Sequence, residues 1–202
     1  MTRNREIIFA AALLVFSGSA AAQTNTPATN TSNTPNIQDR KTDQQDRIAN
    51  GAQSGQLTSG ESKGLETKET GINHEERNMR SQDDGHLTAA DRTKINNQQN
   101  HLSKQIYTDK HNAATAHYGN GEVGQRQRMQ QDRIAEGMRN GQLTAGESSR
   151  LEHQQKSINH EKNNMRAANG GKLTGGDKAA LNQRQNRASG NIYAKKHNAA
   201  KR

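Results

Sequence analysis

The chain contains no cysteine and no tryptophan, and its two phenylalanines, Phe9 and Phe16, both lie among the first twenty residues. Without cysteine, the protein has neither disulfide bonds nor thiolate chemistry. Hydrophobic residues make up 28% of the 202 residues, whereas roughly 45–50% is typical of globular domains. This composition excludes a large enzyme-type core and a multi-span membrane protein. It leaves a helical repeat protein or a partly disordered polyelectrolyte.

Proline is confined to Pro27 and Pro35. Both lie in residues 23–39, a segment rich in Thr, Asn and Ala that buries too little to fold, so we predict a disordered tail there. From residue 39 onward there is no proline at all. This absence favours long helices, because a proline inside a helix costs about 3 kcal/mol.

The first 22 residues resemble a secretory signal peptide. Arg3 and Arg5 precede an apolar run from Ile7 to Phe16, and three alanines ending at Ala22 supply a small-residue cleavage site. The alternative is an uncleaved anchor, but this run is too short to span a bilayer. No cysteine follows it, so a lipid anchor is excluded. We therefore expect cleavage near Ala22 and a bacterial periplasmic or secreted protein.

An internal duplication organises the rest of the chain. Residues 44–113 align without a gap to residues 130–199, with 37 identities in 70 positions. Each copy starts from a Gln-Gln-Asp-Arg-Ile-Ala stretch and ends on Lys-His-Asn-Ala. The predicted organisation is a first copy over 40–113, a linker over 114–125 and a second copy over 126–202.

A shorter motif, G-x-L-T-x-x-[ED], occurs four times: Gly55–Glu61, Gly85–Asp91, Gly141–Glu147 and Gly171–Asp177. Glycine is preferred just past a helix end, and Thr followed three residues later by an acid forms a capping box that opens the next helix. Each motif therefore predicts a tight turn between two helices. The result is an all-α protein of two tandem three-helix units, with helices over 40–53, 59–83, 89–112, 126–139, 145–169 and 175–198.

These helices carry few large apolar residues. In the helix over 59–83, Leu65, Ile72 and Met79 recur every seven residues, whereas a coiled-coil seam needs two apolar positions per heptad. We therefore expect marginal stability for an isolated copy. Packing of the two copies together, a partner or an ion would supply the remainder.

The four motifs also resemble the second half of an EF-hand loop, with its glycine, apolar residue and final acidic ligand. The first half departs from that pattern, because Arg80 and Arg166 stand where two of the loops need their first carboxylate. Calcium requires six to eight oxygen ligands, so the structural turn is the favoured interpretation. A weak divalent-metal site remains as an alternative, and its candidate ligands are Glu61, Asp91, Glu147, Asp177, His74 and His160.

Histidine occurs eight times. His74 and His160 each precede a glutamate, but the position four residues on, which a zinc protease fills with histidine, holds Asn78 or Asn164. His111 and His197 fall at predicted helix ends, where a cation suits the helix dipole. Weak binding of Zn²⁺ or Cu²⁺ by these imidazoles is the alternative. No nucleophile constellation or phosphate loop accompanies them, so we expect no enzyme activity and no cofactor.

Positive charge is concentrated near the C-terminus. Residues 172–202 carry a net charge of +7, with Asp177 as the one acid. Such a stretch suits nucleic acid, lipopolysaccharide phosphates or another polyanion, and the alternative is a solvated helix face. The candidate polyanion-binding residues are Lys172, Lys178, Arg184, Arg187, Lys195 and Lys196.

The string R-I-x-x-G-x-x-x-G-x-L-T-x-x-E-x-x-x-L at Arg47–Leu65 and Arg133–Leu151, with I-Y-x-x-K-H-N-A at Ile106–Ala113 and Ile192–Ala199, resembles a family of small secreted bacterial helical-repeat proteins of unknown function. The resemblance covers both copies and implies an exported helical repeat protein. It carries over no catalytic residues.

The function that these observations favour is a non-enzymatic exported protein whose basic helical surface binds an anionic or protein partner in the cell envelope. One alternative is a periplasmic protein that binds a divalent metal such as Ca²⁺, Zn²⁺ or Cu²⁺. A second is a structural component of the envelope.

Overall fold

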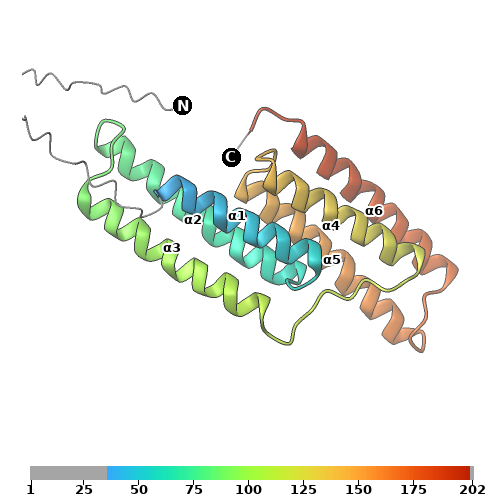
Figure 1. The fold of residues 1–202 in the computed structure, drawn as a ribbon. Coiled ribbons are helices and arrows are strands. Elements are labelled where there is room, and N and C mark those ends of the chain that lie inside the picture. The colour runs from blue at the N-terminus through green and yellow to red at the C-terminus, as the bar shows by residue number, and fades with distance from the viewer. Residues whose placement is uncertain (1–35, 201–202) are drawn as a thin grey trace, which may run out of the picture. The chain divides into compact units, whose positions relative to one another are not determined.

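The structure, a computed structural model, describes residues 36–200. The predicted signal peptide and all but the last few residues of the predicted tail lie outside them. Residues 36–200 contain no strand and fold into α1 (Ile37–Ser54), α2 (Ser59–Gln82), α3 (Ala89–Lys110), α4 (Glu122–Arg139), α5 (Ala145–Ala168) and α6 (Gly175–Lys196) (Figure 1). The all-α prediction is confirmed. None of these six helices has the length and apolar character needed to span a bilayer.

The helix boundaries agree with the predicted ones to within four residues. The largest differences are two early starts. Helix α1 begins at Ile37 rather than residue 40, because the Asn36 side chain accepts a hydrogen bond from the Asp39 N–H at 2.9 Å and caps it. Helix α4 begins at Glu122 rather than residue 126, so it includes part of the predicted linker.

All four repeated motifs form the predicted turns. At the first, the Glu61 N–H donates to Thr58 Oγ1 at 3.2 Å, and the Thr58 N–H donates to Glu61 Oε2 at 2.8 Å. The same reciprocal pair recurs at Thr88–Asp91, Thr144–Glu147 and Thr174–Asp177. Each motif glycine has a positive φ, as at Gly55 with 78°. Capping boxes therefore begin four of the six helices.

The motif leucine folds back over the preceding helix. The Leu57 N–H donates to the Gly51 carbonyl at 2.9 Å, and a Cβ added at Gly51 would lie 2.7 Å from the Leu57 side chain. Gly137 and Leu143 repeat both features in the second copy. Glycine at these helical positions therefore makes room for the buried leucine.

The two copies pack against each other through their first and second helices. Helix α2 packs on α5 and α1 packs on α4, while α3 and α6 each pack on the two other helices of their own copy (Figure 1). Gly60 approaches Lys156, and its counterpart Gly146 approaches Thr70, the counterpart of Lys156. Because these contacts exchange under the 86-residue offset, the copies are related by an approximate twofold rotation.

This packing gives the two copies one shared apolar core. Its buried members include Ile48 and Leu65 from the first copy with Ile134 and Leu151 from the second. Part of the buried apolar surface is thus shared between the copies, whereas a second cluster, formed by Val123, Ile158, Leu181 and Ala188, lies within the second copy. Marginal stability of an isolated copy stays a prediction.

Buried glutamines supplement the apolar core. The Gln44 side-chain amide donates to the Gln99 carbonyl at 2.7 Å and to Ser103 Oγ at 2.8 Å. Gln130 makes the same two bonds in the second copy. These hydrogen bonds join the first helix of each copy to its third helix and satisfy the side-chain N–H donors of Gln44 and Gln130, which are costly to bury alone.

Candidate functional site

The net positive charge of the chain belongs to the second copy. Residues 40–113 contain 11 Lys and Arg and 11 Asp and Glu, a net charge of zero. The aligned residues 126–199 contain 14 Lys and Arg and 6 Asp and Glu, a net charge of +8, and Lys201 and Arg202 add two charges beyond the aligned part. The two copies share the same three-helix arrangement, so the fold does not require this difference.

Part of the charge forms a basic face on α6, consisting of Arg184, Arg187 and Lys195. Their spacing of three and eleven residues places them on the same side of the helix. Arg184 pairs with Glu161 at 2.6 Å and Lys195 with Glu147 at 3.6 Å. Arg187 is exposed and makes no ion pair within residues 36–200.

The structure separates the other predicted polyanion-binding residues from this face. Lys196 is 9% exposed and pairs with Glu136 of α4 at 2.6 Å, so it joins two helices rather than facing solvent. Lys172 and Lys178 are exposed and line a pocket at the other end of α6. The predicted residues therefore form two surfaces and one internal contact.

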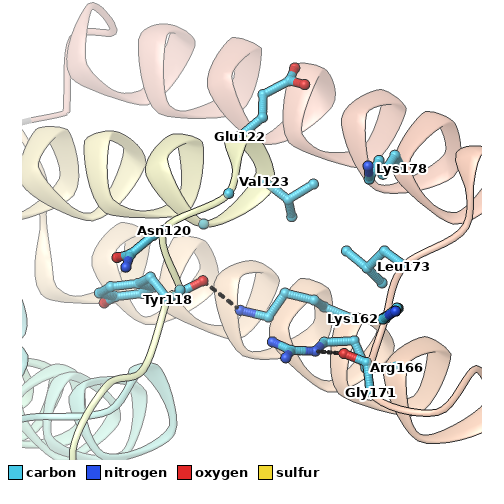
Figure 2. Close-up of a pocket in the computed structure, with 13 residues that line it drawn as sticks. Tyr118, Asn120, Glu122, Val123, Lys162, Arg166, Gly171, Leu173 and Lys178 are labelled. Carbon is cyan, nitrogen blue, oxygen red and sulfur yellow. Dashed lines mark hydrogen bonds between the residues drawn. The ribbon is translucent and has the colours of Figure 1, made fainter.

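That pocket lies between the start of α4, the end of α5 and the turn leading into α6 (Figure 2). Its volume is about 540 Å³. Four cationic side chains line it: Lys162, Arg166, Lys172 and Lys178. We call these four residues and the space between them the basic pocket. Val123 and Leu173 supply apolar wall, and Glu122 is the one carboxylate of the lining.

Lys162 is the most buried of the four cations, at 3% exposed. Its Nζ donates to the Tyr118 carbonyl at 3.2 Å (Figure 2). It also donates to Gln127 Oε1 at 2.7 Å, and both acceptors are neutral. It makes no ion pair within the described residues. Burial, followed by the nearby positive charge of Arg166, lowers the pKa of Lys162 to about 8.

The first copy has ion pairs at the place equivalent to the basic pocket. Glu76 stands at the position of Lys162 and pairs with Lys41 at 3.1 Å and with Arg80 at 2.9 Å. In the second copy Lys41 is replaced by Gln127, so the ion pairs are lost. Arg166, the counterpart of Arg80, donates from Nε to the Gly171 carbonyl at 2.9 Å (Figure 2). Arg80 makes the equivalent bond to the Gly85 carbonyl at 3.1 Å in addition to its ion pair.

The candidate metal ligands are not brought together. Glu61, Asp91, Glu147 and Asp177 sit at four separate turns, where each accepts hydrogen bonds within its own capping box. His74 and His160 are exposed and lie next to Asn78 and Asn164, each 3.2 Å away. No group of three acidic or histidine side chains suited to a metal occurs in residues 36–200. Metal binding at these residues stays a prediction.

The histidines that follow α3 and α6 stack on tyrosines. The ring centroids of Tyr107 and His111 are 4.2 Å apart, and those of Tyr193 and His197 are 4.1 Å apart. In both pairs histidine Nδ1 lies 2.7 Å from the tyrosine carbonyl. This local contact fixes each imidazole at its helix end, the position at which the sequence analysis expected a cation to suit the helix dipole.

Sequence reasoning missed Lys162 and Arg166 as site residues. The signal that could have found them is the opposite charge at aligned positions, Glu76 in one copy and Lys162 in the other. The chain matches no family model, no curated protein and no solved structure.

Proposed function

We propose that the protein is a non-enzymatic, exported binding module whose second copy binds an anionic polymer of the cell envelope. The observation that carries this proposal is the charge difference between the aligned parts of two copies of one fold, zero against +8. The proposed location outside the cytoplasm rests on the expected signal peptide over residues 1–22.

The basic face of α6 would make the main contacts with the polymer. Its counterparts in the first copy are Gln98, His101 and Asp109, so all three positions are more positive in the second copy. An extended row of cations on a helix matches a chain of regularly spaced anions, and counterion release would make the binding strongly salt-dependent.

The test replaces residues of the second copy by their counterparts in the first copy. Each new residue is therefore one that the same fold already contains at the equivalent position. The variant R184Q/R187H/K195D gives the second copy the three residues of the first. Titration of the chain from residue 23 with polyphosphate, at several salt concentrations, should show at least tenfold weaker binding for the variant. The slope of log affinity against log salt should fall by about 2–3, because each lost contact contributes roughly 0.7–0.9.

The matched control is R150E, which changes an exposed arginine of α5 that lies outside the basic face of α6 and the basic pocket. It should weaken polyphosphate binding less than threefold. R150E changes the net charge by −2 and the triple variant by −4. A loss of log affinity for the control that reaches half that of the triple variant would therefore mean that net charge alone drives association. Unchanged binding by the triple variant would remove the basic face of α6 from the proposal.

A further inference from the structure

The basic pocket carries more positive charge than its own surroundings neutralise. Lys162, Arg166, Lys172 and Lys178 line it against a single carboxylate, that of Glu122. Glu122 Oε1 accepts from Asn182 Nδ2 at 3.4 Å, and its side chain points away from Arg166 in Figure 2. None of the four cations makes an ion pair within residues 36–200.

Several of the charge differences between the copies lie at this place. Besides Glu76, which becomes Lys162, three first-copy residues of the neighbouring turn become more positive or lose negative charge: Asp83 becomes Asn169, Asp84 becomes Gly170 and His86 becomes Lys172. Arg166 and Lys178 keep the charge of Arg80 and Arg92. At this end the second copy has thus lost the three carboxylates of Glu76, Asp83 and Asp84. It has also lost one cation, because Gln127 replaces Lys41, and gained one carboxylate, because Glu122 stands at the position of Asn36.

The start of α4 adds unpaired backbone donors. Gly121, its N-cap residue, has no side chain to cap the helix. The N–H groups of Glu122, Val123 and Gly124 have no hydrogen-bond acceptor among the described residues. Such N–H groups favour an anion and are secondary here to the four side-chain cations.

A close backbone contact holds this end in place. A Cβ added at Gly124 would lie 2.2 Å from the Tyr118 carbonyl oxygen and 2.4 Å from that of Gly119. The Tyr118 carbonyl also accepts the hydrogen bond from Lys162. The connection between the copies is therefore packed against α4 and α5, which gives the basic pocket a fixed wall.

We propose that the basic pocket binds a phosphate monoester, with its phosphate against Arg166, Lys172 and Lys178 and its organic part against Val123 and Leu173. Four cations and one carboxylate leave a net charge of +3, which a phosphate dianion neutralises better than a carboxylate does. A guanidinium also matches phosphate geometry with two parallel hydrogen bonds. The volume of about 540 Å³ leaves room for an attached organic group.

This inference deepens the proposed function, on which it rests for the class of ligand, but it uses different residues. The phosphate belongs either to a small free ester or to a pendant or terminal group of the polymer. Lys162 acts as a positioning residue, because its Nζ is occupied by Gln127 and Tyr118 while its charge adds to the field of the basic pocket.

The test is calorimetric titration of the chain from residue 23 with hexyl phosphate, in a buffer free of phosphate. Hexanol tests the apolar wall alone, and inorganic phosphate tests the anion alone. We expect saturable one-to-one binding of hexyl phosphate and at least tenfold weaker binding of both control probes. Equal affinity for hexanol, or no binding of hexyl phosphate, would overturn the proposal. Equal affinity for inorganic phosphate would overturn the role of Val123 and Leu173.

Two variants locate the site. K172E reverses one exposed charge of the lining and should weaken hexyl phosphate binding at least tenfold, whereas R150E should change it less than twofold. The double variant Q127K/K162E rebuilds the first copy's ion pairs with Arg166 and should abolish binding while the circular dichroism spectrum stays helical. Unchanged binding by K172E and by the folded double variant would contradict the proposal.

The same probe separates this inference from the proposed function. R184Q/R187H/K195D should bind hexyl phosphate normally while losing polyphosphate. If K172E also loses polyphosphate, the phosphate in the basic pocket comes from the polymer, and if it does not, the ligand is a separate small ester. Failure of hexyl phosphate to bind, with polyphosphate binding intact, would remove this inference alone.

Discussion

Glu76 and Lys162 occupy equivalent positions in the two copies, are both buried and carry opposite charges. The pKa of Glu76 is lowered, because the ion pairs with Lys41 and Arg80 outweigh the effect of burial, which is the largest single contribution and raises it. Lys162 has two neutral partners instead. In the first copy, ion pairs thus neutralise the buried charge of Glu76. In the second copy, Lys162 keeps a positive charge that no carboxylate of the described residues pairs with, and we propose that a bound anion balances it.

The contact between Gly51 and Leu57 predicts that a single methyl group destabilises the fold. Leu57 is fully buried, and a Cβ at residue 51 would come within 2.7 Å of it. Overpacking of this kind costs about 1–3 kcal/mol, against roughly 1 kcal/mol gained when alanine replaces glycine in a helix. We expect G51A to lower the free energy of unfolding, measured by urea denaturation.

The control for that variant is G64A. Gly64 lies inside α2, its added Cβ would meet nothing within 4 Å, and the second copy has Arg150 at this position. G64A should raise the free energy of unfolding by about 0.5–1 kcal/mol. A stabilising effect of both substitutions would show that Leu57 moves aside without cost.

The buried carboxyl of Glu152 makes stability depend on pH. Burial raises the pKa of Glu152 from 4.5 to about 8, while hydrogen bonds from Gln131 and Ser59 act in the opposite direction. Between about pH 4.5 and 8 the folded state therefore keeps a proton that the unfolded state releases. The stabilisation is complete below pH 4.5 and is lost as the pH rises towards 8, so the free energy of unfolding should fall across this window.

The variant E152Q should reduce that slope, because a neutral amide replaces the titrating group. Urea denaturation of both proteins from pH 4 to pH 9 measures the effect. We expect the variant to be more stable than the wild type at pH 8 and similar to it at pH 4. Parallel pH profiles for the two proteins would assign the dependence to other groups.

The shared core predicts that a single copy cannot remain a stable monomer. The fragment 36–117 would expose the faces of α1 and α2 that pack on α4 and α5 in the whole chain. Because the copies are related by an approximate twofold rotation, a second fragment can cover those faces. We expect a helical homodimer in sedimentation, with a melting temperature that rises with concentration. A monomer with a cooperative, concentration-independent melt would contradict this.

The helices could be predicted from sequence because their ends are local. Thr88 and Asp91, for example, mark a capping box that needs no tertiary partner. The packing could not be predicted in the same way. The role of Gly51 depends on the Leu57 side chain packing against it. The burial of Gln44 depends on a hydrogen bond to the carbonyl of Gln99, 55 residues further along the chain.

The candidate site was predicted in part. Lys172 and Lys178 stood out as members of a basic stretch, but nothing local shows that they share a pocket with Lys162 and Arg166. Lys196 looked equivalent to them in sequence, and its burial against Glu136 follows only from the packing of α6 on α4. Charge can be read from the chain, whereas exposure depends on the neighbouring helices.

The most direct test of the central claim is transfer of polyanion binding between the copies. The starting protein is R184Q/R187H/K195D, and Q98R/H101R/D109K is added to it so that α3 acquires the basic face of α6. The net charge of the chain is thereby restored. Polyphosphate titration at fixed salt should show affinity within threefold of the wild type if a row of cations on this helix face is the binding element. Affinity that stays at the level of the triple variant would contradict the account.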